Sequence, residues 1–402
     1  MIRAHPLREG FTTGSAATAA AVAALRYLLC GDRPGAVVIP PPPRAEIRTP
    51  LHIPVATCAS GPAPGAVTEA ANGLAALPGG IAHACVIKDG GDDPDATNNA
   101  AIYATITLLP KADTPRDAVV LDDAPVPLFL AGGAGIGRVT LPGLPIPVGQ
   151  PAVNPAPREQ IRAAVREALA AVPLPPDAAG VLVTLSVPEG RAIAARTFNP
   201  RLGIMDGISI LGTQGTVRPF SHAAWQASIA QGISVAGATD CPGLGMSTGR
   251  RSERLLMARY PGWPAQSFVQ VADFAAFSLE QAGRSSLPIL AWGCFFGKAV
   301  KLAQGHASTH ARDAVLDMER LAGLAAACGV AQAATLRSCT TAALALERLL
   351  ATGPPGHRTL AAVANDAART AARFARRPVR VHIFADGGSE LASACLNPQR
   401  NR

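Results

Sequence analysis

The stretch LPILAWGCFFGKAVKLAQG, residues 287–305, carries the pattern that decides the fold of the second half of the chain. An apolar run of strand type (287–292) leads directly into glycines, and a helical pattern follows. Strand patterns of the same kind occur at 207–211 and 267–274, and a last one lies at 379–385. Strands that alternate with helices predict an α/β, Rossmann-like domain with a mainly parallel sheet.

Helical patterns fill the spaces between these strands. They are expected around 222–231, at 247–260 and three times within 311–375. The residues just before the second of these helices, 241–246, include a proline and two glycines and therefore predict a poor strand.

The first half of the chain shows a different pattern, one helix followed by short strands. Residues 11–31 predict a helix that Thr12, Thr13 or Ser15 can cap at its start and that Gly31 ends. Turn residues separate the following runs of β type, with few helical patterns between them: 36–40, 51–58, 83–88, 101–109 and 126–131. This order predicts an α+β domain.

The segment NPRLG (199–203) predicts the boundary between the two halves. Shortly before it, the runs 181–187 and 192–198 predict a β-hairpin. We therefore expect an α+β domain over residues 1–200 and a Rossmann-like domain over residues 201–402.

Composition and charge limit the class of protein. The net charge of +8 is compatible with an acidic ligand, but no basic run with interleaved aromatic residues points to nucleic acid. Eight scattered cysteines without a C-x-x-C pair indicate reduced, mostly buried thiols. The apolar stretch 16–30 contains polar residues and is shorter than the ~20 residues of a membrane span. We expect a soluble, cytoplasmic protein that binds no membrane.

The carboxyl ends of the predicted parallel strands form the first candidate site, because ligands bind there in open α/β sheets. Most of these ends are turns rich in glycine or hydroxyl residues that open a helix, which suits a nucleotide or a carboxylate. The candidate cofactor-binding residues are Gly212, Thr213, Gly215, Ser247, Thr248, Gly249, Arg250, Asp273, Gly293, Gly297 and Lys298. No turn is a complete Rossmann or Walker signature, since Ala299 follows Lys298, and one such turn alone is more often a plain connection.

The acidic segment KDGGDDPDATNN (88–99) forms the second candidate site. Counted as an EF-hand from Asp89, its twelfth position is Ala100, so the bidentate glutamate of a calcium loop is missing. A magnesium site would need a phosphate partner, and a solvated turn would fit the glycines and the proline. Because the segment lies between two apolar strands, we favour a loop held by backbone N–H groups and by Thr97 or Asn98, near an active site.

Two further motifs have a structural and a functional interpretation. The dense glycines of 132–137 indicate either close approach of the main chain to a ligand or a bulge or corner in a sheet. His306 and His310 have a spacing that fits a metal on a helix, but the glutamate of H-E-x-x-H is replaced by Ala307. We expect no metal site in the protein.

Taken together, several segments resemble the blocks of the cobalt-precorrin-5B C(1)-methyltransferases of cobalamin biosynthesis, over nearly the whole chain. The blocks are REGFTTGSAATAAAVAAL, VIKDGGDDPDATNNAAI, GGAGIGRVTLPGLPIPVGQPAVNPAPR, FNPRLGIMDGISILGTQGTVRP, STGRRSE, FVQVADFAAFSL and FGKAVKLAQGHASTH. The resemblance implies methyl transfer from S-adenosylmethionine to ring carbon C-1 of a cobalt-containing corrinoid, giving cobalt-precorrin-6A. The cobalt then arrives in the substrate.

This resemblance, with the motifs above, gives roles to the candidate residues. The strand ends of the second domain would hold S-adenosylmethionine, and Asp89 or Asp92 would take up a proton or steady the developing charge of the ring. The residues expected to face the corrinoid are Thr12, Thr13, Gly14, Ser15, Lys88, Asp93, Asp95, Gly133, Gly135, Gly137 and Arg138.

The chain departs from the family pattern at three places, one of them being 241–246, where the family usually has an apolar strand before S-T-G, and two other functions stay open. Ala16 stands where the N-terminal block usually has a cysteine, and Asn98 stands where the acidic block often has a histidine. Neither the cysteine nor the histidine of the family pattern can therefore have an essential role in this chain. The alternatives are a nucleotide-dependent phosphotransferase using Lys298 and magnesium, and a tetrapyrrole carrier without catalysis. A homodimer is also left open.

Overall fold

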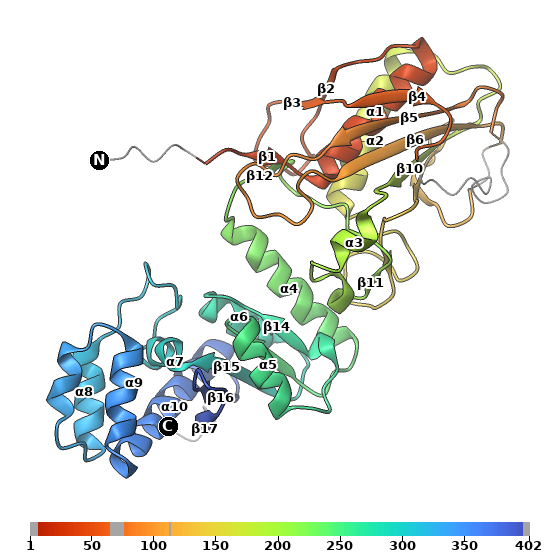
Figure 1. Ribbon diagram of the computed structural model, residues 1–402. Coiled ribbons are helices and arrows are strands. Elements are labelled where there is room, and N and C mark those ends of the chain that lie inside the picture. Colours follow the sequence, from red (N-terminus) through yellow and green to blue (C-terminus); the bar gives the residue numbers. More distant parts are fainter. Residues whose placement is uncertain (1–6, 65–75, 112–113, 397–402) are drawn as a thin grey trace, which may run out of the picture. The chain divides into compact units, whose positions relative to one another are not determined.

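A computed structural model describes residues 7–64, 76–111 and 114–396 of the chain. It divides into two compact units, Met1–Ser221 and His222–Arg402 (Figure 1).

The elements of unit 1 surround one large sheet. Its helices are α1 (Thr13–Cys30), α2 (Pro155–Ala171) and α3 (Gly190–Ala194), with a 3-10 turn η2 (Asn199–Leu202). Its strands are β1 (Gly10–Phe11), β2 (Ala36–Ile39), β3 (Leu51–Pro54), β4 (Thr57–Ser60), β5 (Ile81–Ile87), β6 (Ala101–Leu109), β7 (Val119–Asp122), β8 (Leu128–Gly132), β9 (Arg138–Val139), β10 (Gly180–Ser186), β11 (Ile204–Met205) and β12 (Thr216–Val217). The large sheet has the order β4-β5-β6-β10-β8-β7, and each neighbouring pair is antiparallel except β10 with β8.

Helix α1 is the centre of the core of unit 1. Thr12 caps its start with a side-chain bond to the Ser15 N–H, and Gly31 ends it in the left-handed conformation. Residues 13–25 are all buried against α2, β5 and β6, and their many alanines let these elements approach closely. The helix has the length and hydropathy of a membrane span, but 72% of that window is buried inside the protein. It is therefore a core helix.

Unit 2 is built on a sheet whose strands are mainly parallel. Its strands are β13 (Leu244–Ser247), β14 (Phe268–Gln270), β15 (Leu290–Phe295), β16 (Val379–Phe384) and β17 (Glu390–Leu396). Its helices are α4 (His222–Ala238), α5 (Arg250–Arg259), α6 (Ala275–Arg284), α7 (Phe296–Ala303), α8 (Met318–Ala327), α9 (Ala342–Ala351) and α10 (Pro354–Ala375), with 3-10 turns η3 (Ala265–Ser267) and η4 (Ala333–Ser338). The sheet order is β14-β13-β15-β16-β17, in which only the last pair of strands is antiparallel.

Helices cover both faces of this second sheet. Helix α5 contacts β13, β14, β15 and β16 on one face, where Leu256 and Phe268 belong to a small apolar cluster. The larger core on the other face joins the sheet to α4, α6, α7 and α10. Parallel strands buried on both faces are apolar throughout, and the continuous apolar run at 287–292 therefore predicts a strand from the sequence.

Four local predictions are wrong. Residues 207–211 join no sheet of unit 2, because Ile208 and Ile210 form isolated bridges to Ile136 and Val153 in unit 1. The expected hairpin partner 192–198 is not a strand, and α3 stands there instead because the turn after β10 packs on the backbone of Gly135.

At the other end of the chain, the poor strand expected before Ser247 is a regular one, β13, because flanking parallel strands supply its hydrogen bonds. Strand 379–385 is also not the last, since β17 turns back to pair with it.

Candidate functional site

The carboxyl edge of the sheet in unit 2 has the geometry of a ligand site. From β13 the chain passes through α5 to β14 on one side, and then through α6 to β15 on the other side of β13. The connections that leave β13 and β15 therefore run in opposite directions, and ligands bind at such a switch point in open α/β sheets. Of the predicted residues, Ser247 ends β13, Thr248 and Gly249 form the turn after it and Arg250 begins α5, while Gly293 lies inside β15 and Gly297 and Lys298 lie in the first turn of α7, which follows β15 directly.

The start of α5 at this edge offers backbone donors. Its N-cap is Gly249, which has no side chain to accept a bond from the first helical N–H groups. A Cβ at Gly249 would meet no atom of the described chain within 4 Å. The free N–H groups and the helix dipole at this open position favour an anionic group.

Ser247, the last residue of β13, is the least satisfied polar group at this edge. Its side chain is fully buried, and its Oγ has no hydrogen-bond partner in the part of the chain that the structure describes. A buried hydroxyl without a partner costs about 1–3 kcal/mol. Such a group is typical of a site that a ligand completes.

Asp273, which follows β14, and Lys298, which lies in α7 after β15, form an ion pair at the same edge of the sheet. Lys298 Nζ lies 2.9 Å from Asp273 Oδ1, and the Thr309 hydroxyl donates to the same oxygen at 2.8 Å. Burial raises the pKa of Asp273, but these two bonds and the lysine charge outweigh it and lower the pKa. Asp273 is thus an ionised carboxylate that anchors the loop after α7.

His306 and His310 lie in that loop, not on a helix, since α7 ends at Ala303. Their four-residue spacing therefore does not put them on one helical face. Among the residues described, no group of three or more His, Cys, Asp or Glu side chains is arranged to hold a metal ion.

Gly212, Thr213 and Gly215 do not belong to this edge, which corrects their predicted place on the parallel sheet. Gly212 packs on Thr12, and the N–H of Thr12 donates to the carbonyl of Gly215 at 3.0 Å. These residues enclose the start of α1 in unit 1. Local sequence could not show this, because the contacts join segments about two hundred residues apart.

The T-T-G-S segment at the start of α1 is bonded to that same stretch. Thr13 Oγ1 donates to the carbonyl of Leu211 at 3.1 Å, and Ser15 Oγ donates to the carbonyl of Gly215 at 2.9 Å. Gly14 has no room for a side chain, since a Cβ would lie 2.8 Å from Pro157. The residues predicted to face a substrate therefore hold two parts of unit 1 together.

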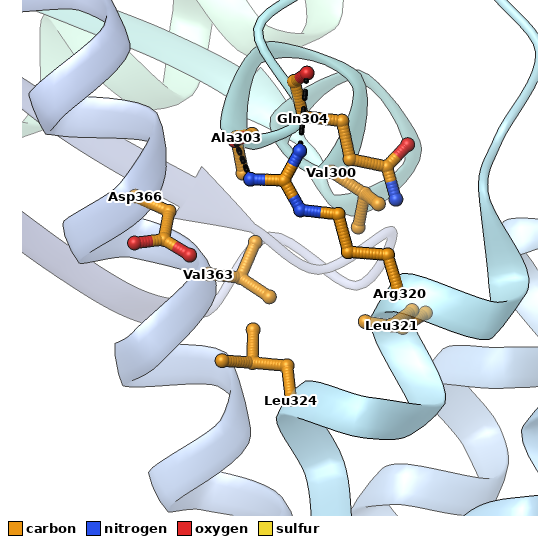
Figure 2. Close-up of a pocket in the computed structure, with 8 residues that line it drawn as sticks. All are labelled: Val300, Ala303, Gln304, Arg320, Leu321, Leu324, Val363 and Asp366. Atoms are coloured by element: carbon orange, nitrogen blue, oxygen red, sulfur yellow. Dashed lines mark hydrogen bonds between the residues drawn. The ribbon is translucent and has the colours of Figure 1, made fainter. Parts of the chain in front are cut away.

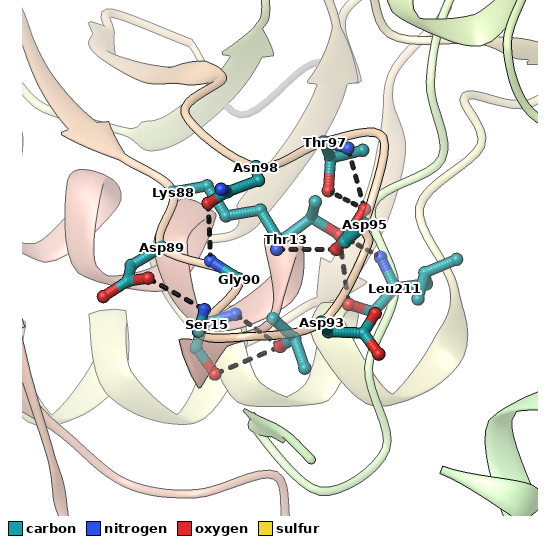
Figure 3. Close-up of polar contacts among 12 residues, drawn as sticks. Thr13, Ser15, Lys88, Asp89, Gly90, Asp93, Asp95, Thr97, Asn98 and Leu211 are labelled. Carbon is teal, nitrogen blue, oxygen red and sulfur yellow. Dashed lines mark hydrogen bonds and ion pairs between the residues drawn. The ribbon is translucent and has the colours of Figure 1, made fainter. Parts of the chain in front are cut away.

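The acidic loop between β5 and β6 is also held from within (Figure 3). Lys88 is 1% exposed, and its Nζ lies 2.7 Å from Asp95 Oδ2. The other carboxylate oxygen, Oδ1, accepts bonds from the N–H and the hydroxyl of Thr97, and Asn98 accepts a bond from the N–H of Gly90. Burial acts to raise the pKa of Asp95, but the charge and bond of Lys88 and the Thr97 bonds lower it. The predicted role of Thr97 and Asn98 in holding the loop is confirmed.

Asp89 and Asp92 bind the segment that precedes α1. Arg8 forms a bidentate ion pair with Asp89, and the backbone N–H of Arg8 donates to Asp92 Oδ2 at 2.7 Å. The hydrogen bond from Arg8 is the main cause that lowers the pKa of Asp89, followed by the bond from the Gly91 N–H. A carboxyl group with a lowered pKa is ionised at neutral pH and has no proton to donate.

Asp93 and Arg138 lie apart from these contacts and are bound differently. Asp93 Oδ1 accepts a bond from the N–H of Phe220 at 2.9 Å. Arg138 donates to the carbonyl of Gly149 and lies 3.6 Å from Asp117, with nearly half of its side chain exposed.

The glycines of 132–137 lie against other parts of the protein itself. A Cβ at Gly135, which has a φ of +73°, would lie 1.8 Å from the carbonyl oxygen of Val187. A Cβ at Gly137 would lie 2.4 Å from Ile204, and one at Gly133 2.9 Å from the Ser186 hydroxyl. Of the two interpretations left open by the sequence, the structural one explains the density of glycines.

One hollow lies among the helices of unit 2 (Figure 2). It has a volume of about 200 Å³, and Val300, Leu321, Leu324 and Val363 give it an apolar wall. The Arg320 guanidinium at its rim contacts the carbonyls of Ala303 and Gln304 at the end of α7. None of the residues predicted from the sequence lines it.

Sequence reasoning missed two kinds of residue near these sites. Arg8 was overlooked because nothing local links it to carboxylates about eighty positions later. Glu253 and Gln270, which are bonded to each other at 2.8 Å beside Ser247, have the pattern of ordinary helix and strand positions. For Glu253, the signal was an acidic residue in the first turn of a helix that follows S-T-G.

Comparisons with known proteins give a consistent result. A family model described as CbiD matches residues 2–219, and one described as CbiD, C-terminal domain, matches residues 308–395. A cobalt-precorrin-5B C(1)-methyltransferase from Nitratidesulfovibrio vulgaris is 49% identical over 96% of this chain and 93% of its own length. The protein of the same name from Geobacillus kaustophilus is 43% identical over 84% of this chain and 81% of its own length.

One solved structure was also found, the 1.9 Å crystal structure of cobalamin biosynthesis protein (cbiD) from Archaeoglobus fulgidus. It is 22% identical and covers 72% of this chain and 78% of its own, with a TM-score of 0.36.

Proposed function

Because the chain belongs to the CbiD family, we propose that its unit 2 binds the methyl donor and that its unit 1 binds the corrinoid acceptor. The activity is the methylation of cobalt-precorrin-5B at C-1, a step of cobalamin biosynthesis. The methyl donor is S-adenosylmethionine, and the product is cobalt-precorrin-6A. The enzyme works in the cytoplasm.

The donor site lies at the carboxyl edge between β13 and β15. The observation that carries this proposal is the switch point of the sheet, with the unpartnered Ser247 hydroxyl and the open start of α5 beside it. Thr248 and Gly249 would let the donor approach the backbone, and the α5 N–H groups would bind its anionic part. Asp273 and Lys298 would shape the neighbouring wall as a fixed pair.

The acceptor binds to loops of unit 1. A corrinoid precursor carries many carboxylates, which suits a chain with an excess of eight positive charges. Arg138 keeps nearly half of its side chain exposed and can bind such a group. The acidic loop acts as a support that fixes the start of α1. Its carboxylates at Asp89 and Asp95 are paired with Arg8 and Lys88.

The chemistry asks the protein mainly to position two ligands. S-adenosylmethionine supplies an electrophilic methyl group, which the electron-rich C-1 of the ring takes up as the carbon–sulfur bond breaks. Residues at the sheet edge would hold the donor in line and keep water away, and such alignment can lower the activation barrier by about 7–11 kcal/mol. No proton donor or acceptor is required in that step.

Calorimetric titration of the full chain tests the proposal. S-adenosylmethionine and S-adenosylhomocysteine should both bind with one site per chain, whereas ATP with Mg²⁺ should not. Tight, metal-dependent binding of ATP without binding of S-adenosylhomocysteine would support a phosphotransferase instead. Binding of a corrinoid alone would support a carrier.

A further inference from the structure

The hollow among the helices of unit 2 is large for an apolar space in a folded chain. Helices α7 and α8 both pack on α10, and the hollow is the space left between the three (Figure 2). Val300, Leu321, Leu324 and Val363 form its apolar wall, and all of them but Leu324 are buried. Voids larger than a water molecule are few in proteins, because wall atoms without neighbours lose their dispersion contacts. A volume of about 200 Å³ therefore favours a ligand that fills it.

This volume sets the size of the ligand. A dry apolar cavity of about 150 Å³ in a protein takes up a benzene molecule. The hollow, at about 200 Å³, has room for one such ring and a small substituent. Drug-sized molecules occupy pockets of about 300–1,000 Å³, so the hollow is too small for a nucleotide or a tetrapyrrole.

A cation at the rim of the hollow has no carboxylate partner. Arg320, near the start of α8, donates to the carbonyls of Gln304 and Ala303 at 3.4 Å and 3.5 Å. Both distances lie at the long end of the hydrogen-bond range. The guanidinium forms no ion pair with any residue that the structure describes. It therefore has donors left for a carboxylate, which an arginine can bind at two points.

Two carboxylates close to the hollow are bound to other groups. Asp317 caps the start of α8, where it accepts a bond from the backbone N–H of Arg320 at 2.9 Å. Asp366 of α10, across the hollow from Arg320 in Figure 2, forms an ion pair with Arg369. Within the described chain, the rim thus offers one unpaired positive charge beside an apolar wall.

We propose that this hollow binds a small organic anion, with one carboxylate on an apolar body about the size of a benzene ring. The apolar body fills the space between α7, α8 and α10, and the carboxylate accepts hydrogen bonds from the Arg320 guanidinium at the rim. A neutral molecule of the same size leaves this cation unpaired, and a second cation is repelled by it. The proposal is independent of the proposed donor and acceptor sites, because no residue of the hollow belongs to either.

Three single-ring probes that differ in charge provide the test. Sodium benzoate carries a carboxylate, benzyl alcohol is neutral, and benzylamine is a cation. In NMR titrations of the full chain, benzoate should bind at one site with a dissociation constant of about 1 mM, an ordinary affinity for so small a ligand. Benzyl alcohol and benzylamine should each bind at least about tenfold more weakly, because a charge-assisted bond to arginine contributes a factor of that size.

Two substitutions act on the two parts of the site. Arg320→Gln removes the cation, so benzoate should bind about tenfold more weakly while the affinity for benzyl alcohol changes by less than about twofold. Leu324 points across the hollow toward Val363 (Figure 2). Leu324→Phe places a ring inside the hollow, so this variant should bind none of the probes.

Each substitution has a matched control outside the hollow. Arg358 of α10 also donates to a carbonyl at the end of a helix, that of Cys328 at 3.1 Å, and Leu350 lies on α9. Neither side chain lines the hollow. Arg358→Gln and Leu350→Phe should therefore bind benzoate as the wild type does.

Melting temperatures show whether each variant is folded, and Leu324→Phe keeps the test valid if Arg320→Gln is unstable. The proposal is wrong if benzoate shows no saturable binding below about 20 mM, if Leu324→Phe binds it as the wild type does, or if Arg358→Gln loses as much affinity as Arg320→Gln. Equal binding of benzoate and benzyl alcohol would also overturn it, and would indicate that the hollow takes an uncharged apolar group, such as a side chain of a second copy.

Discussion

The acidic loop of unit 1 and the sheet edge of unit 2 use their polar groups in opposite ways. In the loop, Asp89, Asp92 and Asp95 all bind groups of the protein itself. At the edge, the Ser247 hydroxyl lacks a partner in the described chain, and α5 begins at a glycine. A dense charge pattern in a sequence can therefore mark a structural hub, whereas a ligand site is marked by polar groups that the fold leaves unsatisfied.

The largest expected effect concerns the buried ion pair of the loop. Replacing Lys88 with methionine leaves Asp95 with a charge that is three-quarters buried and without its cation. Removal of one partner of a buried pair costs about 3–5 kcal/mol, and we expect a loss of that size in the free energy of unfolding of unit 1. Urea denaturation measures it.

Lys111→Met is the control for this substitution, because Lys111 is exposed. It should change the stability by less than about 0.5 kcal/mol. If Lys88→Met were equally mild, the loop would not be a structural hub, and its contrast with the sheet edge would fail.

A smaller effect is expected on turnover from the two aspartates that hold Arg8. Asp89→Asn and Asp92→Asn keep the shape of the side chains and weaken only their bonds to Arg8, so kcat should fall by less than about tenfold, whereas a general acid or base contributes about 10²–10⁴-fold. A loss of about 100-fold at saturating substrates, in a variant that melts like the wild type, would restore the catalytic role that the sequence suggested.

The smallest effect is a pH dependence inside the second sheet. His382 is buried, its Nε2 lies 2.9 Å from the Tyr260 hydroxyl and its Nδ1 lies 3.0 Å from Glu390. Burial, as the main cause, lowers its pKa below the ordinary 6.5, although Glu390 acts to raise it. His382 then binds a proton more readily in the unfolded chain than in the folded one. The free energy of unfolding is therefore highest above pH 6.5 and declines as the pH falls below that value.

His382→Gln should remove this part of the pH dependence. Thermal melts of both proteins between pH 8 and about pH 5 measure it. A wild-type melting temperature that rises as the pH falls through this range, with no such rise in the variant, would show that the Glu390 charge outweighs burial and raises the pKa of His382.

The sequence by itself determined those features that depend on neighbouring residues. The caps of α1 at Thr12 and Gly31, the apolar run of β15 and the helices within 311–375 follow from local propensity and period, and the structure has them there. The turn after Ser247 and the helix start that contains Lys298 could likewise be predicted to lie at one edge, because a parallel sheet brings its strand ends together there. The block pattern also indicated the family.

Only the tertiary structure decided which distant segments meet. It assigned 212–215 to the start of α1, joined Arg8 to the acidic loop, brought Gly135 against Val187 and added β17 to the sheet. It also showed that the Ser247 hydroxyl is unsatisfied within the described chain and that Gln270, its partner in the neighbouring strand, donates to Glu253. Local periodicity carries no record of such contacts, because their free energy depends on groups that come together only when the whole chain has folded.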